Sequence, residues 1–362
     1  MASLAKALLL KVPIIQSPMA GISTVRMAAA VTNNGGLGSL PFGATDLTQV
    51  ATIKKQLEEF TQLTGNYKVN LNFFCHDIQP ESTPAQNKNW EKLFEDYKYD
   101  KSSIKFTGAK NSFRELEKDS NLFQEFIGYI DGAKPAILSF HFGIPNQSSI
   151  DHIHRAGSLV FISVTSVDEA RAAFDAGADG VICQGYEAGG HRGNFLADDA
   201  HDEKLTTNEL FSRVKQANFA DSKYIVPAGG IMNSDGIKQY MLQGASAVQM
   251  GTIFLFSEDS NSHPFIKTID KLATTVMTSI ISGRTARCIE TPFIKNVNGK
   301  FTASGMEMGS LPPYGCSYSA YKSFKLTQAP DCGFYLAGAN WRLISDKNTQ
   351  EILQQLQNEL SA

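Results

Sequence analysis

Cysteine is sparse in this chain of 362 residues, and no two cysteines lie close together in the sequence. The five cysteines are Cys75, Cys183, Cys288, Cys316 and Cys332. An odd, dispersed set without a C-x-x-C pair argues against a disulfide framework and fits a reducing compartment. We therefore expect a cytoplasmic protein. The opening MASLAKALLLKVPII has a short apolar patch without a small-residue cleavage site, so an organellar leader is the alternative.

Long apolar runs and an excess of charge of either sign are also missing. No run is long enough to span a bilayer, and the formal net charge is −3. We therefore expect neither a membrane nor a nucleic acid as partner, and a monomer or homodimer that acts on small molecules. The P-loop, the serine nucleophile elbow and the kinase motifs are absent as well.

The histidines show no metal-ligand spacing, so we expect no metal site. His152 and His154 fall in a stretch that has the pattern of a helix or its start. His76 and His201 stand beside acidic residues, in segments that we interpret as surface loops.

A series of short apolar runs, each ending in glycine, proline or polar residues, is the main pattern that is present. Such continuous runs are typical of parallel strands buried on both faces. Helical patterns with acidic starts and glycine stops separate the later runs, as in 166–178 and 233–245. Strands and helices that alternate eight times predict an α/β fold, a (β/α)8 TIM barrel, with an open doubly wound sheet as the alternative. The eight runs are 12–21, 35–43, 67–74, 136–143, 159–166, 180–190, 224–231 and 247–256.

Two segments depart from this alternation. Residues 75–134 are long, charged and aromatic, and we interpret them as a helical insertion between the third and fourth strands. From Asp270 onward we expect a helix and then a loop-rich stretch, 304–324, which together cap the barrel mouth. The predicted division is a barrel of 1–74 and 135–269, an insertion of 75–134, and C-terminal helices with a substrate-side loop in 270–362.

The active site of such a barrel lies at the carboxyl ends of the strands. The sequences PAGGI and QMGT follow the seventh and eighth runs, the position where barrels often bind phosphate. A tight strand-to-helix turn is the alternative for each one alone. Phosphate-binding candidates are therefore Gly229, Gly230, Gln249, Met250, Gly251 and Thr252.

The sequence CQGYEAGGHRG follows the sixth run and places His191 among glycines that free the backbone for an unusual loop. An imidazole titrates near neutrality, which suits proton abstraction, and we interpret His191 as a catalytic base rather than an incidental loop residue. Arg192 and Glu187 are expected to hold the loop. His141 ends the fourth run and either faces the barrel mouth or serves in packing.

These segments, in this order, resemble the motifs of the nitronate monooxygenase family, formerly the 2-nitropropane dioxygenases. The matching stretches cover most of the chain: 13–40, SFHFGIP (139–145), CQGYEAGGHRG (183–193), QMGTIFLFSE (249–258) and LPPYGCSYSAYK (311–322). The resemblance implies a TIM barrel that binds FMN, and the E-A-G-G-H-R-G segment is similar to the first class of the family.

The resemblance also implies roles for individual residues. His191 would be the catalytic base. Leu336–Trp341 departs from the family pattern, because Asn340 does not match the spacing of an expected glutamine. Cofactor contacts would be Pro18, Met19, Ala20, Gly21, Asn70, Gln184, Gly189, Gly229, Gly230, Gln249, Met250, Gly251 and Thr252, and the substrate side would include His141, Tyr314, Tyr318 and Lys322.

The reaction that the resemblance implies is oxidation of an alkyl nitronate by dioxygen, which yields a carbonyl compound with nitrite or nitrate. Propionate 3-nitronate would be the substrate and detoxification the role. The alternatives are an FMN-dependent enoyl reductase that uses NAD(P)H and a non-catalytic flavin-binding barrel.

Overall fold

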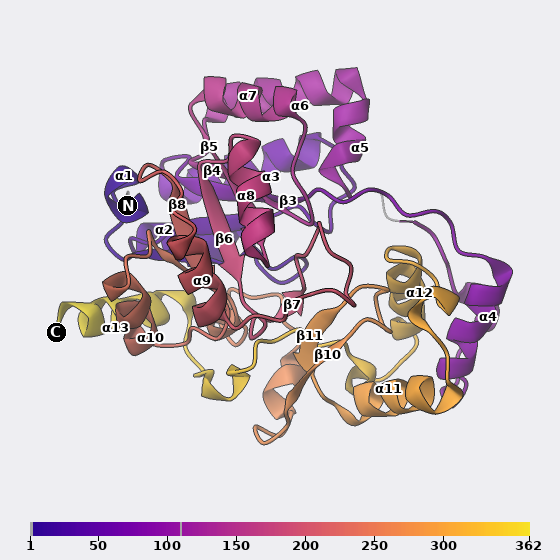
Figure 1. Cartoon of the computed structure of the whole chain (residues 1–362). Helices are drawn as coiled ribbons and strands as arrows, with labels where there is room; N and C mark the ends of the chain where they lie inside the picture. Colours follow the sequence, from indigo (N-terminus) through magenta and orange to yellow (C-terminus); the bar gives the residue numbers. More distant parts are fainter. Residues whose placement is uncertain (1–2, 109–110) are drawn as a thin grey trace.

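Eight parallel strands form the centre of the protein (Figure 1). The structure is a computed structural model that describes residues 3–108 and 111–362. The sheet runs in the order β1-β9-β8-β6-β5-β4-β3-β2, and a parallel bridge between Ile15 and Leu37 joins its two ends. The sheet is therefore a barrel, which confirms the predicted fold over the doubly wound sheet. The barrel strands are β1 (Ile14–Gln16), β2 (Gly38–Pro41), β3 (Val69–Phe74), β4 (Ile137–His141), β5 (Leu159–Val164), β6 (Gly180–Gln184), β8 (Tyr224–Ala228) and β9 (Val248–Met250).

Helices follow these strands and cover the outside of the barrel. The start and stop signals work as predicted: Ser166 caps α8 by accepting from the Glu169 amide, and Gly177 takes a positive φ of 97° just after it. The last helix, α13, packs against α2 and α10 and so completes the outer layer. The covering helices are α2 (Val25–Asn33), α3 (Ala51–Thr64), α5 (Phe113–Lys118), α6 (Ser120–Ala133), α7 (Gln147–Ala156), α8 (Val167–Asp175), α9 (Thr207–Gln216), α10 (Ser234–Leu242) and α13 (Thr349–Ser361), and the short α1 (Leu4–Ala7) precedes β1.

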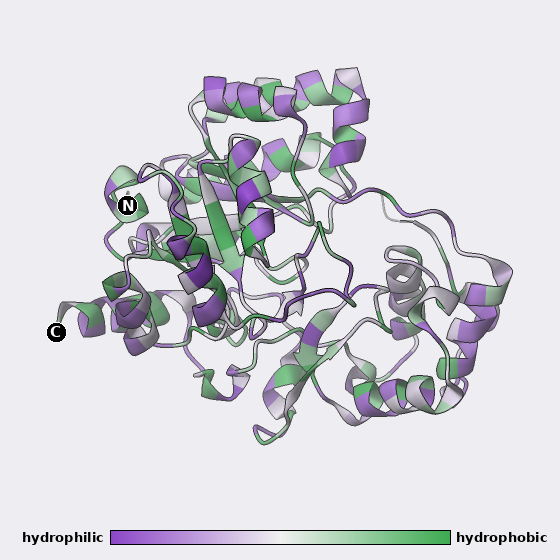
Figure 2. Cartoon of the chain, in the orientation of Figure 1, coloured by the Kyte–Doolittle hydropathy of each residue, from purple (hydrophilic) through white to green (hydrophobic). Residues whose placement is uncertain are grey.

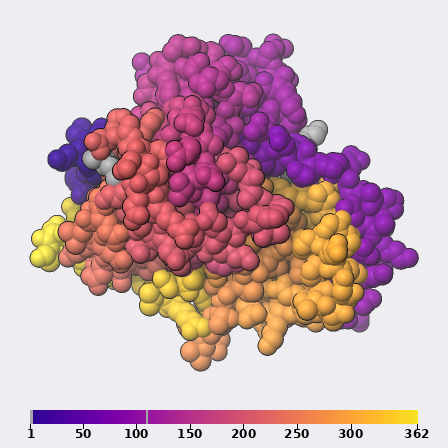
Figure 3. Space-filling view, in the orientation of Figure 1, coloured from indigo at the N-terminus to yellow at the C-terminus, as the bar shows by residue number. Residues whose placement is uncertain are grey.

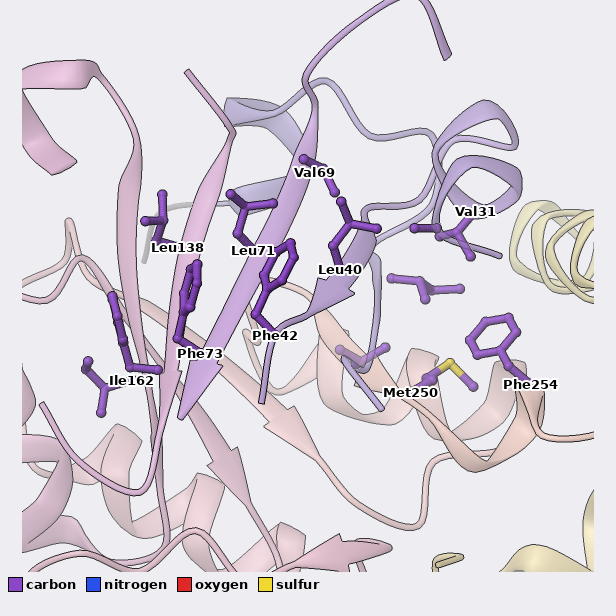
Figure 4. Packing of buried hydrophobic residues seen from close by; sticks show 14 of the residues in the cluster. Val31, Leu40, Phe42, Val69, Leu71, Phe73, Leu138, Ile162, Met250 and Phe254 are labelled. Carbon is purple, nitrogen blue, oxygen red and sulfur yellow. The ribbon is translucent and has the colours of Figure 1, made fainter. Parts of the chain in front are cut away.

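The main core lies between the barrel and these helices. Along β3, Val69, Leu71 and Phe73 point outward to this layer, while Asn70 and Asn72 point into the barrel, as the two-residue period of a strand requires. Figure 4 shows this packing around Phe42 and Phe73, whose rings lie 5.3 Å apart. Figure 2 shows the same division, with hydrophobic residues concentrated in the central strands.

A smaller lobe stands beside the barrel mouth and joins two distant parts of the chain. Its core packs Trp90 of α4 (Pro84–Leu93) and Phe94, which directly follows this helix, against Phe293 of α11 (Pro292–Ser304) and Phe324 of α12 (Cys316–Lys325). Figure 3 shows the purple segment that carries α4 beside the orange segment that carries α11 and α12. The 3-10 turns are η1 (Lys101–Ser103), η2 (Thr252–Phe254), η3 (Pro264–Thr268), η4 (Met308–Ser310), η5 (Pro330–Cys332) and η6 (Trp341–Leu343).

Two features of the C-terminal segment differ from the expectation. The expected helix is present as α11, but a hairpin of β10 (Thr275–Thr278) and β11 (Ala286–Ile289), which pairs with the two-residue β7 (Gly190–His191), precedes it. The stretch expected to be loop-rich holds helix α12, because Tyr321 and Phe324 bury one helical face in the small lobe. Within residues 3–108 and 111–362, no helix has the length and hydropathy of a membrane span.

Candidate active site

A cavity of about 760 Å³ opens at the carboxyl ends of the barrel strands, where the sequence predicts the site. Every predicted site residue except Asn70 lines it. The lining residues that the sequence singles out are Pro18, Met19, Ala20, Gly21, His141, Gln184, Gly189, His191, Gly229, Gly230, Gln249, Met250, Gly251, Thr252, Tyr314, Tyr318 and Lys322.

Asn70 is the exception because it lies deeper in the barrel. Its side chain donates to Ser39 Oγ at 3.0 Å, and its Oδ1 has no partner among the described residues. Two residues further along β3, Asn72 occupies the lining position and donates to the hydroxyl of Ser139 at 3.0 Å. An amide therefore does face the cavity from this strand, but it belongs to Asn72.

The loops after β8 and β9 have the features of a phosphate-binding site. Gly229 and Gly230 take positive φ values of 128° and 70°, which open the turn so that its backbone faces the cavity. The amide N–H groups of Gly230 and Thr252 donate to no acceptor within the described chain. Unpaired backbone donors directed at a cavity favour an anionic group such as a phosphate.

The segment that departs from the family pattern also reaches these loops. Gly338 N donates to Thr252 Oγ1 at 2.9 Å, and Asn340 Nδ2 donates to Gly230 O at 2.7 Å. A β-carbon on Gly189 would lie 2.5 Å from the backbone of Ala337, so the close approach of the two segments requires glycine there. Asn340 thus supports the loop after β8 by donating to the carbonyl of Gly230, and it also lines the cavity.

The loop that carries His191 is held by a dense set of hydrogen bonds. Gln184 Nε2 donates to His191 O at 2.9 Å, and Gln184 Oε1 accepts from Gly193 N at 2.7 Å. Arg192, buried, forms a two-pronged ion pair with Asp202, with both N–O distances 2.9 Å. Such a bidentate pair fixes orientation as well as contributing energy. The expected holding role of Arg192 is therefore present in the structure.

Glu187 holds the same loop from the other side. Its Oε2 accepts from both the backbone N and the Oγ1 of Thr207, at 2.8 Å and 3.0 Å. Thr207 Oγ1 in turn lies 3.0 Å from Gly229 O, so the loop after β6 is joined to the loop after β8. The candidate base and the candidate phosphate loop therefore share one framework.

The ring of His191 is enclosed by aromatic side chains. It lies edge-on to Tyr314 and Tyr318, with ring centroids 5.6 Å and 5.8 Å away, and its Nε2 lies 2.9 Å from Ser282 Oγ. Burial first, and then the positive charge of Arg284, lower the pKa of His191 to about 3. The imidazole is therefore neutral at physiological pH.

Arg284 is a partly buried cation that forms no ion pair with any carboxylate in the described residues. Its guanidinium stacks 3.9 Å from the ring centre of Phe142 and donates to the backbone carbonyls of Arg192 and Asn194. It contributes to the lowered pKa of three histidines, which are His76, His141 and His191.

Helix α12 supplies the opposite wall of the cavity. Tyr314, Tyr318 and Lys322 are four residues apart, so they lie along one face of this helix and its entry turn. The Lys322 ammonium lies 4.4 Å from the ring centre of Tyr318, and burial lowers its pKa. No carboxylate forms an ion pair with Lys322 in the part of the chain that the structure describes.

The positions of the other histidines agree only in part with those predicted from the sequence. His152 and His154 lie on α7, outside the cavity, and His201 is exposed. The surface position predicted for His76 is wrong, because its ring packs 5.2 Å from that of Tyr314 and is 6% exposed. His141 faces the barrel mouth, and its Nε2 lies 3.1 Å from His191 O. Among the described residues, no cluster of three or more His, Cys, Asp or Glu side chains could hold a metal ion.

Three histidines make the folded state sensitive to acid, of which His76 and His191 are buried and His141 is partly buried. Burial lowers the pKa of His76 to about 4, and the pKa values of His141 and His191 to about 3, from 6.5. Their stabilisation is complete above pH 6.5 and is lost progressively as the pH falls toward the folded-state values, because only the unfolded chain takes up protons in this range. Between pH 7.5 and 5.5 we expect a loss of about 1.4 kcal/mol per histidine.

Urea unfolding at these two pH values tests this expectation. His141→Asn removes one of the three groups and should reduce the difference in unfolding free energy by about one third. Equal stability of the wild-type protein at pH 7.5 and 5.5 would contradict the assignment of buried neutral histidines.

Three further residues contribute to the site, and the sequence offers a signal for one of them. Asn72 stands near the end of a predicted strand, so its position is a usable signal. Ser282 and Arg284 lie in the turn between β10 and β11, a segment without a recognisable motif.

Comparison with known proteins places this cavity in context. The family model described as nitronate monooxygenase matches residues 2–359. A putative nitronate monooxygenase from Saccharomyces cerevisiae is 40% identical over 372 aligned residues, which cover 96% of this chain and 90% of that protein. A nitronate monooxygenase from Pseudomonas aeruginosa is 32% identical over 357 residues and 96% of each chain. The solved structure of a nitroalkane oxidase from Streptomyces ansochromogenes is 26% identical, with a TM-score of 0.80 over 99% of this chain and 98% of that one.

Proposed function

Because the chain belongs to the nitronate monooxygenase family of oxidoreductases, we propose that it oxidises alkyl nitronates with dioxygen and uses FMN bound in the barrel mouth. The observation that carries the proposal is one cavity in which three features come together. It combines unpaired backbone donors at one end, the neutral ring of His191, and the unpaired ammonium of Lys322.

The residues present fit FMN at the phosphate end and along the ring. The phosphate would be held by backbone N–H groups of Gly229, Gly230, Gly251 and Thr252. Because these residues have a small side chain or none, the phosphate can approach their backbone closely. The loop from Pro18 to Gly21 would lie along the isoalloxazine ring. Gln249 Oε1 is buried without a partner in the described chain and could accept from a ligand donor. The flavin, when bound, supplies the electron transfer that no side chain of the cavity can perform.

Lys322 favours an anionic substrate. Its side chain is exposed at the cavity, its ammonium lies against the ring of Tyr318, and no carboxylate of the described residues pairs with it, so an anion that enters the cavity would find an unpaired cation. A nitronate is such an anion, with negative charge on its nitro oxygens. Propionate 3-nitronate, which carries a second negative charge, is the substrate that we propose, and its removal as a toxin is the proposed role.

His191 would act on neutral nitroalkanes only. A nitronate has already lost its α-proton and needs no base, whereas a neutral nitroalkane must lose one before it can react. With a pKa of about 3, the imidazole of His191 is neutral at physiological pH but is a weak base. We therefore propose that nitronates are the better substrates.

Replacement of Lys322 by methionine tests the anion site. Methionine keeps an apolar stem of similar length but removes the charge, so the KM for propionate 3-nitronate should rise about 10- to 100-fold, the value of one hydrogen bond to a charged group. The KM for neutral 1-nitropropane should change little. Steady-state oxygen consumption measures both, and Lys325→Met, on the same helix but outside the cavity, is the control. Equal effects on the two substrates would refute the charge-based role.

A further inference from the structure

Ser282 is the residue that contacts the ring nitrogen of His191, although it does not line the cavity. It lies in the turn between β10 and β11 and is completely buried. Its Oγ lies 2.9 Å from His191 Nε2 and donates to the backbone O of Arg284, also at 2.9 Å. The hydroxyl is therefore in contact with two groups at once.

The proton count at Ser282 determines the tautomer of His191. A hydroxyl has one proton, and a carbonyl oxygen can only accept, so the Ser282 proton is used on Arg284 O. The remaining lone pairs of Ser282 Oγ can only accept, and Nε2 of His191 must therefore carry a proton. A neutral imidazole has one N–H, so the lone pair of the ring lies on Nδ1.

The surroundings of Nδ1 agree with this count. Nδ1 makes no hydrogen bond to any described residue, and it is not among the completely buried polar atoms that lack a partner. Since His191 lines the cavity, Nδ1 is the ring nitrogen that is open to it. A base needs this arrangement, with a lone pair facing the substrate.

The backbone around the pair is held independently of the hydrogen bond. His191 pairs with Ala286 across β7 and β11, on the same strand that follows the Ser282 turn. Within that turn, a β-carbon on Gly283 would lie 2.6 Å from Tyr314 N, so the turn packs tightly against the entry to α12. The backbone positions of Ser282 and His191 are therefore both fixed by other contacts, and these contacts hold the two side chains within hydrogen-bond distance.

We propose that Ser282 is a positioning residue that holds His191 in the Nε2–H tautomer and so directs the Nδ1 lone pair into the cavity. The inference rests on the proposed role of His191 as a base for neutral nitroalkanes, and it adds the residue that makes this role possible. Ser282 does not touch the substrate. Without its hydroxyl, Nε2–H would lack an acceptor, and the Nδ1–H tautomer would present a donor where a base is required.

Nitrogen-15 NMR of the histidine-labelled holoprotein at pH 7.5 tests the tautomer directly. The His191 signals are identified by their loss in His191→Asn. We expect a protonated Nε2 and an unprotonated Nδ1 in the wild type and in Ser282→Thr, which keeps the hydroxyl. In Ser282→Ala the Nδ1–H form should become populated. Ser279→Ala, in the same turn but bonded to Met308, is the matched control and should resemble the wild type.

Kinetics give a second, separate readout. In Ser282→Ala, kcat for a neutral nitroalkane should fall about 10-fold or more, while nitronate oxidation stays within about threefold of wild type. An Nδ1–H tautomer in the wild type, or an unchanged tautomer in Ser282→Ala, would overturn the inference whatever the activity. The expected tautomers together with full nitroalkane turnover in His191→Asn would leave the tautomer assignment standing and refute the base role instead.

Discussion

Replacement of His191 by asparagine should lower kcat/KM for a neutral nitroalkane by about 10²- to 10⁴-fold, the contribution of a positioned general base. The wild-type ring is neutral, enclosed by Tyr314 and Tyr318, and open to the cavity at one nitrogen. Asparagine keeps a polar side chain but has no basic nitrogen. Oxidation of the corresponding nitronate should largely survive, because its α-proton is already gone.

The comparison of the two substrates makes this prediction specific. Oxygen consumption with 1-nitropropane and with its preformed nitronate, at the same pH and enzyme concentration, gives the ratio directly. A general loss of structure or of flavin would lower both rates together. Equal loss on both substrates, with normal flavin content, would show that His191 does not act as a base.

Replacement of Gly251 by valine should remove most of the flavin. A β-carbon at this position would lie 2.9 Å from Ser17 Cβ and 3.0 Å from Ser17 Oγ, so a valine side chain would crowd Ser17, which also lines the cavity. Overpacking of this kind costs about 1–3 kcal/mol even where the neighbours can shift. Because the bulk falls on the proposed phosphate site, we expect the cost to appear as weaker FMN binding.

The absorbance ratio of flavin to protein after purification measures this effect. We expect a decrease of at least about 10-fold in FMN affinity, which corresponds to about 1.4 kcal/mol. Gly299→Ala, in the middle of α11 with open space around its β-carbon, is the control and should keep full flavin content. A normal ratio in Gly251→Val with an unchanged circular dichroism spectrum would move the phosphate site elsewhere.

The barrel and most of the cavity lining follow from short-range patterns. Each barrel strand is an apolar run, and the residues that follow it must lie at the same end of a parallel barrel. Gly229, Gly230, Gly251 and His191 could be assigned to one site for this reason. The choice of Asn70 at β3 misses the lining residue Asn72 for the same reason: with a period of two, both side chains point inward, and the pattern does not show which lies deeper.

The parts that could not be predicted depend on contacts between distant segments. Ser282 and His191 are 91 positions apart in the sequence. They come into contact because their segments pair in a three-stranded sheet, one strand of which has only two residues. His76 stands beside an acidic residue, which suggests exposure, but Tyr314 of the C-terminal segment covers it. Both contacts arise only when the small lobe packs against the barrel mouth, and no local periodicity encodes that packing.

Anaerobic mixing of the purified protein with propionate 3-nitronate tests the central claim most directly. The account predicts that the protein is yellow, that the band of oxidised flavin decreases on addition of the nitronate alone, and that air restores it with release of nitrite or nitrate. NADH alone should leave the band unchanged. A colourless protein, or a flavin that NADH bleaches and the nitronate does not, would contradict the proposed function, and the latter result would favour an NADH-dependent reductase.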